Sequence, residues 1–346
     1  MKYSILLVSF FFILSVSCNK VKDSEKSVQN GTSKGTGYTF GLVTGLGELG
    51  DFAFNDMQYN GMIMAKKQFG ISFHYNSPKT VEEDTAKIEE LIRKGCNVIF
   101  AGGGYHMIDP VDKLAPKYPQ VLFILLDDTP KTLYKNVAGI IFKQNEGSFL
   151  AGALAASMTR SNSIGTVSAM NLTIINDFIV GFKAGALYVK PNIQFHNLYL
   201  AEDMKSSNPF SDPQMGFNAS VKLIKQYKTD VLFQIASASG TGVFNAAKEE
   251  GIFAIGVDSD QDFLAKGTVL TSMMKRLDVA ILFMVERIIG NNFENRVFSL
   301  GLKENGIGLS PMQYTKNIIP ETVRTKISVI EKDIIEGKIH VPSSYK

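Results

Sequence analysis

A regular alternation of two kinds of segment, which begins at residue 38, limits the possible folds of this chain more than any other feature. Short runs rich in β-branched and aromatic residues are typical of strands, and the longer amphipathic stretches between them are typical of helices. A helix between two strands is the connection that places those strands parallel in one sheet. The alternation therefore predicts an α/β fold, with parallel sheets that carry helices on both faces.

The predicted elements cover most of the chain after residue 38. One strand, residues 121–126, is apolar throughout, as a strand covered on both faces requires. The other predicted strands are residues 38–44, 71–75, 97–101, 137–142, 163–168, 193–198, 230–236, 253–257 and 268–274. The predicted helices are residues 55–69, 81–94, 146–159, 177–189, 212–226, 240–250 and 278–289, with a further helix over residues 320–336 near the C-terminus.

The chain length and an internal repeat favour two similar lobes. A chain of 346 residues is long for one hydrophobic core. Residues 88–102 and 221–236 resemble each other, since each reads as a helix that leads into an apolar strand. A Gly/Ser-rich loop follows each of them, at residues 102–104 and 237–240. A repeated helix–strand unit in an α/β chain predicts that the two halves fold alike.

The expected lobes define where a ligand would bind. We expect lobe 1 at residues 38–150 together with part of the C-terminal region, lobe 2 at residues 151–275, and completion of both by residues 276–346. Open parallel sheets bind ligands at the carboxyl ends of their strands. Two such sheets that face each other predict two lobes with a ligand cleft between them, which closes at a hinge.

The first 17 residues read as an export signal. A charged start precedes an apolar stretch of about a dozen residues, which is shorter than a membrane-spanning helix. Cys18 stands at the expected cleavage site, which is typical of a bacterial lipoprotein whose N-terminal cysteine carries fatty chains. Residues 18–37 are polar and are expected to form a flexible tether. The alternative is an ordinary signal peptide that contains a cysteine; with either, the protein leaves the cytoplasm.

Composition argues against several classes of partner and cofactor. The formal net charge of +3, which loses Lys2 when the signal is cleaved, is too small to indicate a nucleic-acid partner. Cys96 opens an apolar run and reads as a buried small hydrophobe, not as a nucleophile. The four histidines do not show the spacing of metal ligands. We therefore expect no metal and no other cofactor.

Four loops directly follow predicted strands and are candidates to line the cleft. The first is rich in glycine and opens a helix, so its backbone N–H groups can meet a polar ligand, while Phe52 is expected to pack the helix onto the core. The paired aspartates of the last loop permit a calcium site, although one ligand-facing carboxylate with helix-capping neighbours is the simpler interpretation. The four loops are residues 45–55, 127–130, 208–216 and 256–262.

Five stretches of these loops and their neighbours match a known family. Residues 38–346 resemble the basic membrane protein / purine nucleoside receptor A lipoproteins, which are substrate-binding components of nucleoside ABC importers. The resemblance implies a two-lobed periplasmic-binding-protein fold, which the alternation of elements predicts independently. The matching stretches are residues 51–55 (DFAFN), 142–152 (FKQNEGSFLAG), 210–214 (FSDPQ), 255–261 (IGVDSDQ) and 269–276 (VLTSMMKR).

The resemblance also implies a set of ligand-binding residues. It assigns Phe54 and Phe210 to the two faces of a purine ring, Asn55 and Asp127 to the edge of the base, and Asp258 and Lys275 to the ribose hydroxyls. Aromatic rings stack on the flat faces of a base, and one carboxylate can accept hydrogen bonds from two neighbouring hydroxyls. The chain departs from the family at Gly45, where the family has an aspartate, so a polar contact with the ligand is missing there.

The leading interpretation is a lipid-anchored, monomeric binding protein that captures a purine nucleoside (adenosine, guanosine or inosine) and delivers it to an ABC permease. The anchor would lie in the bacterial cell envelope, on the periplasmic face of the inner membrane or on the outer surface. A nucleoside-cleaving enzyme is one alternative, but the loops contain no nucleophile–base pair at a readable spacing and no Gly-x-Ser-x-Gly elbow. A surface adhesin or antigen with weak or altered ligand binding is the other.

Overall fold

The structure is a computed structural model that describes residues 37–46, 48–203 and 208–345. The expected signal peptide, Cys18 and the expected tether up to residue 36 lie outside the described residues. Within the described ranges, no helix combines the length and the apolar character that crossing a membrane requires.

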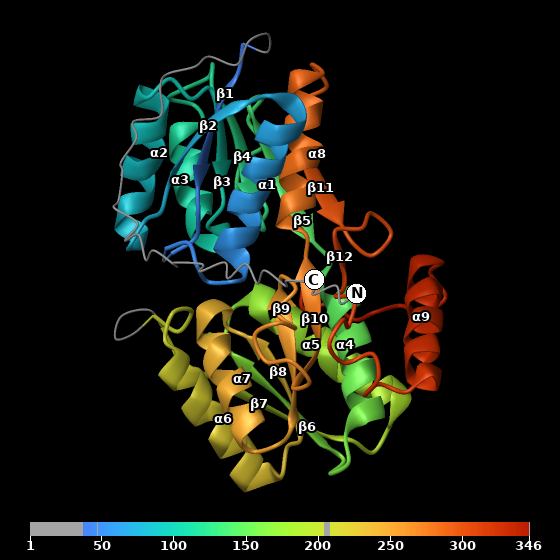
Figure 1. Cartoon of the computed structure of the whole chain (residues 1–346). Helices are drawn as coiled ribbons and strands as arrows, with labels where there is room; N and C mark the ends of the chain where they lie inside the picture. Colours follow the sequence, from blue (N-terminus) through green and yellow to red (C-terminus); the bar gives the residue numbers. More distant parts are fainter. Residues whose placement is uncertain (1–36, 47, 204–207, 346) are drawn as a thin grey trace, which may run out of the picture. The chain divides into compact units, whose positions relative to one another are not determined.

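In the described part of the chain, six strands form one sheet, which we call sheet A (Figure 1). Their spatial order is β11-β5-β4-β3-β1-β2, and every neighbouring pair is parallel. The strands are β1 (Thr39–Val43), β2 (Ser72–Asn76), β3 (Val98–Ala101), β4 (Leu122–Leu126), β5 (Val137–Phe142) and β11 (Val297–Leu300).

A second sheet, sheet B, also contains six of the described strands, in the order β12-β10-β9-β8-β6-β7. Its neighbouring pairs are parallel except that β12 runs antiparallel to β10. The strands are β6 (Ser163–Ser168), β7 (Gln194–Tyr199), β8 (Val231–Ile235), β9 (Phe253–Asp258), β10 (Val269–Lys275) and β12 (Ile307–Leu309).

The two sheets have the same order of strands, so each strand of sheet A has a counterpart in sheet B. β3 and β8 occupy the same place in their sheets, as do β4 and β9. The repeat noted in the sequence consists of two helix–strand units, of which one ends with β3 and the other with β8. The predicted α/β fold with two parallel sheets is therefore confirmed, and the repeat marks equivalent parts of the two halves.

Helices cover both faces of each sheet (Figure 1). On β3, Val98 and Phe100 belong to a buried cluster that includes residues of α1 and α8, whereas Ile99 belongs to a second cluster that includes residues of α2 and α3. This alternation follows from the two-residue period of a strand. The described helices are α1 (Phe54–Phe69), α2 (Asp84–Arg93), α3 (Ile108–Leu114), α4 (Gln144–Met158), α5 (Thr173–Val189), α6 (Pro213–Tyr227), α7 (Gly240–Glu249), α8 (Leu277–Ile289) and α9 (Glu321–Ile335).

The chain crosses between the sheets, and the helices after the crossings pack with the other sheet's helices. α4 follows β5 of sheet A but packs against α5, and α8 follows β10 of sheet B but packs against α1. We therefore use lobe 1 for sheet A with α1, α2, α3 and α8, and lobe 2 for sheet B with α4, α5, α6, α7 and α9. Lys143 and Arg276 lie at two of the crossings, and the third runs from β11 to β12.

Three short elements were not predicted: α3, β11 and β12. α3 contains Pro110, which lies in its first turn, where the missing N–H of proline leaves no hydrogen bond unmade. β11 and β12 have four and three residues, too few to show a periodic pattern. Cys96 is buried as predicted, and burial raises the pKa of its thiol to about 11, so the thiol stays protonated at neutral pH.

Candidate ligand-binding site

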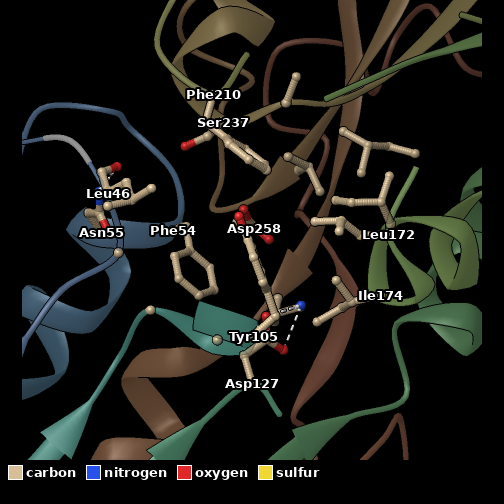
Figure 2. A pocket seen from close by; sticks show the side chains of 18 of the residues that line it. Leu46, Phe54, Asn55, Tyr105, Asp127, Leu172, Ile174, Phe210, Ser237 and Asp258 are labelled. Atoms are coloured by element: carbon tan, nitrogen blue, oxygen red, sulfur yellow. Dashed lines mark hydrogen bonds and ion pairs between the residues drawn. The ribbon is translucent and has the colours of Figure 1, made fainter. Parts of the chain in front are cut away.

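A pocket with a cavity volume of about 110 Å³, partly open to solvent, lies at the carboxyl ends of strands from both sheets (Figure 2). Sheet A contributes residues that follow β1, β3 and β4, and sheet B contributes residues at the ends of β8, β9 and β10. All six residues that the resemblance assigns to ligand binding line the pocket: Phe54, Asn55, Asp127, Phe210, Asp258 and Lys275. Their positions are thus established, and their roles stay predictions.

Aromatic side chains line the pocket from both lobes, and two of them, Phe54 and Phe210, are the ones that the resemblance assigns to the ligand. Phe54 is the first residue of α1, and Phe210 lies in the turn before α6, whose N-cap Asp212 accepts hydrogen bonds from two backbone N–H groups. Figure 2 shows both rings directed towards the space beside Asp258. Among the described aromatic residues, these two rings do not contact each other or a third ring. Both rings pack in part against the hydrophobic core and also line the pocket.

A buried ion pair joins the lobes at the base of the pocket. The Lys275 ammonium lies 2.7 Å and 2.8 Å from the two carboxylate oxygens of Asp127, and both side chains are almost completely buried. The ammonium also lies 4.8 Å from the centre of the Phe178 ring, a distance that allows a cation–π interaction. The resemblance assigns Lys275, together with Asp258, to the ribose hydroxyls, and in the structure the Lys275 ammonium is bound to Asp127.

Asp258 is a second buried carboxyl, and no basic side chain in the described part of the chain forms an ion pair with it. Burial raises its pKa to about 7; Lys275 opposes this rise, while the negative charges of Asp127 and Asp51 add to it. Burial also raises the pKa of Asp127, and the Lys275 ammonium works against that rise. The pocket therefore holds one carboxyl that is neutralised by an ammonium and one that gains or loses its proton near neutral pH.

Asp127 and Asp258 occupy equivalent places in the two lobes. They stand at the carboxyl ends of β4 and β9, which correspond in sheet order. Both have a φ of +67°, in the left-handed region that most residues avoid and that aspartate and asparagine tolerate. Each carboxyl group is therefore turned out of its strand by the same backbone bend, and both reach the same pocket.

Asn55 contributes an amide group at the edge of the pocket. Its side chain is buried, its Nδ2 donates a long hydrogen bond of 3.5 Å to the carbonyl of Leu46, and its Oδ1 has no partner among the described residues. Gly45 lies close by, since a Cβ there would stand 3.0 Å from this Oδ1. A buried carbonyl without a donor is costly, so the Oδ1 is suited to accept a hydrogen bond from a ligand.

The loop before α1 also connects the lobes. Asp51 accepts hydrogen bonds from the backbone N–H groups of Ala53 and Asn55 and from the Ser237 hydroxyl of lobe 2. The prediction that Phe52 packs the helix onto the core is wrong: its φ is +50°, and its ring is 45% exposed. The ring makes an edge contact with Phe263 of lobe 2, because the left-handed backbone turns the side chain away from the core.

Residues 256–262 are held by hydrogen bonds within the protein. Asp262 accepts hydrogen bonds from the hydroxyls of Ser272 and Ser310, and Gln261 accepts from the backbone N–H of Val257. Burial raises the pKa of Asp262 to about 6. In the described residues, no group of three or more His, Cys, Asp or Glu side chains is placed to hold a metal ion. Of the aspartates in this loop, Asp258 is the one that lines the pocket.

The sequence interpretation missed part of the pocket lining. The loops after β3 and β8 reach the pocket, and the sequence signal for both was the Gly/Ser-rich stretch that ends each copy of the repeat. The apolar wall contributed by α5 and the turn before it had no such signal, because its residues read as ordinary core positions. The lining residues not assigned beforehand include Gly103, Tyr105, His106, Leu172, Ile174 and Ser237.

Comparison with known proteins gives a consistent result. A family model described as ABC transporter substrate-binding protein PnrA-like matches residues 41–345. The ABC transporter nucleoside-binding protein BmpA of Lactococcus lactis is 27% identical over 366 residues, which cover 99% of this chain and all of that protein. A lipoprotein of Pyrococcus horikoshii is 30% identical over 276 residues, which cover 77% of this chain and 67% of that protein.

A similar fold is known from crystal structures. A solute-binding protein of an ABC transporter system from Aeropyrum pernix K1 has a TM-score of 0.79 and covers 88% of this chain and 94% of its own. Its sequence identity of 24% makes this likeness evidence for the fold alone.

Proposed function

We propose that this chain, which belongs to the family of PnrA-like ABC transporter substrate-binding proteins, captures a purine nucleoside and passes it to an ABC permease. The family consists of binding components of transporters and is not a class of enzymes. The proposal for the ligand rests on the pocket, where two separate aromatic rings and a buried carboxyl come together. The name of the Lactococcus lactis relative supports a nucleoside as the ligand.

The observation that carries the proposal is the placement of Phe54 and Phe210 on different lobes. A purine has two flat faces, and stacking of one base face on an aromatic ring contributes about 1–3 kcal/mol. If each lobe supplies one ring, the base can be enclosed only when the lobes are together, which couples binding to closure. The base edge would then meet Asn55, whose Oδ1 has no partner among the described residues.

The sugar would lie against Asp258. A carboxylate accepts hydrogen bonds from the two vicinal hydroxyls of a ribose at once, and charged hydrogen bonds are stronger than neutral ones. Lys275 would donate to the same hydroxyls, and Asp127 holds its ammonium beside Asp258. Asp127 thus has a positioning role in this proposal, and a contact with the base edge would require one of its oxygens to be shared with Lys275.

Replacing either aromatic ring tests the stacking directly. Phe54→Ala and Phe210→Ala should each weaken nucleoside binding by about 1–3 kcal/mol, because each removes one face of the stack. Isothermal titration calorimetry with inosine, adenosine and guanosine measures the loss. Phe73→Ala is a matched control, since Phe73 contacts Tyr59 outside the pocket and should leave the affinity unchanged. Unchanged affinity in both pocket variants, with a lowered melting temperature, would assign these rings to structure instead.

We further propose that Cys18 carries the lipid that anchors the protein. Support comes from the export signal in the sequence and from the Pyrococcus horikoshii relative, which is named a lipoprotein. Cys18→Ser should release the protein from membranes, because two or three fatty chains hold a protein durably and the described helices cannot span a bilayer. The measurement is the distribution between the membrane and soluble fractions after a salt wash. A Ser variant that stays with the membrane would contradict the anchor.

The function itself is tested by what the intact protein binds. Mass spectrometry of the protein released under native conditions should find a nucleoside in the pocket, and added nucleoside should raise the melting temperature. Incubation with a nucleoside should yield no free base, because the proposal assigns no bond cleavage to the pocket. Release of free base would favour an enzyme, and the absence of any melting shift would favour a lipoprotein with another role.

A further inference from the structure

A buried histidine–aspartate pair lines the pocket outside the set of residues assigned above. His106 lies in the loop after β3, and its Nδ1 is 2.6 Å from Oδ2 of Asp84, the first residue of α2. The His106 side chain is 6% exposed and the Asp84 side chain is fully buried. Burying a carboxylate is costly, and one hydrogen bond from a neutral imidazole offsets only part of that cost. The pair therefore needs another explanation.

The surroundings of Asp84 determine where the imidazole proton sits. Burial raises the pKa of Asp84, while the hydrogen bond with His106 lowers it. A carboxylate can only accept, so the Nδ1 of His106 must donate to it. In the neutral ring, this leaves the Nε2 with a lone pair, which makes the Nε2 an acceptor.

The free edge of the ring faces the glycine loop that lines the pocket. A Cβ on Gly103 would lie 2.4 Å from Nε2 and 2.2 Å from Cε1 of His106, so a side chain there would collide with this edge. The φ of Gly103 is −86°, which any residue can adopt. Glycine is required here because a larger side chain would collide with the His106 ring, not because of the backbone conformation. The Nε2 has no hydrogen-bond partner among the residues that the structure describes.

The place of His106 in the sheet puts it between two proposed ligand contacts. The loops after β1, β3 and β4 carry Asn55, His106 and Asp127, and the sheet order places β3 between β1 and β4. A ligand that reaches from the base edge at Asn55 to the ion pair at Asp127 must therefore pass the β3 loop. That loop is fixed further by Gln58, whose Nε2 donates to the carbonyl of Gly102 at 2.9 Å.

We propose that the Nε2 of His106 accepts a hydrogen bond from the bound ligand and that Asp84 is the positioning residue that keeps it an acceptor. This inference rests on the proposed function, since the ligand is taken to be a nucleoside. Two donors on a purine nucleoside have the required chemistry: the 5′-hydroxyl of the sugar and an N–H group of the base. His106 then selects ligands that carry a donor at that point.

Asp84→Asn is the sharpest test, because it changes the tautomer and keeps the shape. When its Nδ2 faces the ring, the asparagine donates to Nδ1, which moves the proton to Nε2 and turns the acceptor into a second donor; nitrogen-15 NMR of the variant checks that the proton has moved. We expect a loss of about tenfold or more in affinity for adenosine, measured by calorimetry, since two donors would then face each other. His106→Leu should lose a similar amount, because leucine offers no acceptor. His196→Asn is the matched control, because His196 stacks on Tyr227 outside the pocket and its replacement should leave affinity unchanged.

Two further measurements identify the donor and the tautomer. If the 5′-hydroxyl is the donor, 5′-deoxyadenosine should bind the wild type and the Asp84→Asn variant equally; if an N–H of the base is the donor, purine riboside without the amino group should do so. Nitrogen-15 NMR of the wild type should show the His106 proton on Nδ1 and a shift of Nε2 when adenosine binds.

The inference fails without the proposed function failing if the wild type binds adenosine and both His106→Leu and an Asp84→Asn variant with its proton on Nε2 bind it equally well. It also fails if NMR of the wild type finds the proton on Nε2, a result that holds even where a variant does not fold. If the wild type binds no nucleoside in calorimetry, the proposed function and this inference are both overturned.

Discussion

Lys275→Met is expected to lower the free energy of unfolding by about 3–5 kcal/mol, the largest effect of any single replacement considered for this protein. The reason is Asp127, which would keep a buried negative charge without the ammonium that now contacts both of its oxygens. Denaturant unfolding followed by circular dichroism measures the change; the chain has no tryptophan to report it by fluorescence. The deficit should shrink as the pH falls, because protonation removes the charge on Asp127.

Two controls separate the buried pair from salt bridges in general. Lys94→Met breaks an exposed pair with Glu90, whose nitrogen–oxygen distance is also 2.7 Å, and should cost no more than about 1 kcal/mol. The double variant Asp127→Asn with Lys275→Met should recover most of the lost stability, because no unpaired charge remains. If Lys275→Met costs no more than Lys94→Met, the pair is not the interaction that the structure describes.

Asp258→Asn is expected to stabilise the protein and to reduce its affinity for a ribonucleoside by at least about tenfold. The two effects share one cause, the buried carboxyl with a pKa near 7. Because this pKa lies above the ordinary value of 3.8, the native state favours the protonated form. The cost of ionisation is absent below pH 4 and grows as the pH rises towards 7. Asparagine does not ionise, and it tolerates the φ of +67°, where alanine would add strain.

The pH dependence of both effects has a defined sign. At pH 8 the Asn variant should be more stable than the wild type by about 1 kcal/mol or more, since one pKa unit corresponds to about 1.4 kcal/mol, and at pH 4 the two should be equal. Affinity of the wild type for a ribonucleoside should fall as the pH drops below 7, because the carboxylate is the form that accepts from both hydroxyls. Asp109→Asn, at a side chain that is 86% exposed, serves as the control. An Asn variant that is less stable at pH 8 would show that Asp258 has a partner in the fold.

The fold was largely predictable because the strands and helices carry their own periodic patterns. The apolar run of β4 requires cover on both faces, and the structure provides helices on both. The strands β11 and β12 could not be predicted, since they are short and pair with strands more than thirty residues away in the chain. Their pairing depends on how the chain crosses between the sheets, which local sequence does not encode.

The sequence predicted which residues line the site better than it predicted which of them contact each other. Asp127 and Asp258 follow apolar strands, and Phe54 opens a helix. Such positions lie at the carboxyl edge of a parallel sheet, so the pattern alone places these residues near the ligand site. The partner of Lys275 is 148 residues away along the chain, on the other lobe, and nothing local distinguishes Asp127 from Asp258 as that partner. The contact between His106 and Asp84 was not predicted for the same reason. The fold brings the two residues together, and their spacing in the sequence shows no pattern.

Calorimetric titration of the wild-type protein with ribonucleosides and their 2′-deoxy forms tests the central claim most directly. If Asp258 holds the ribose hydroxyls, inosine, adenosine and guanosine should each bind more tightly than the corresponding 2′-deoxynucleoside, and hypoxanthine should bind weakly. In the Asp258→Asn variant the difference between the ribose and deoxyribose forms should shrink. Equal affinity for both forms in the wild type would contradict the assignment of the sugar to Asp258, and no binding of any nucleoside would contradict the proposed function.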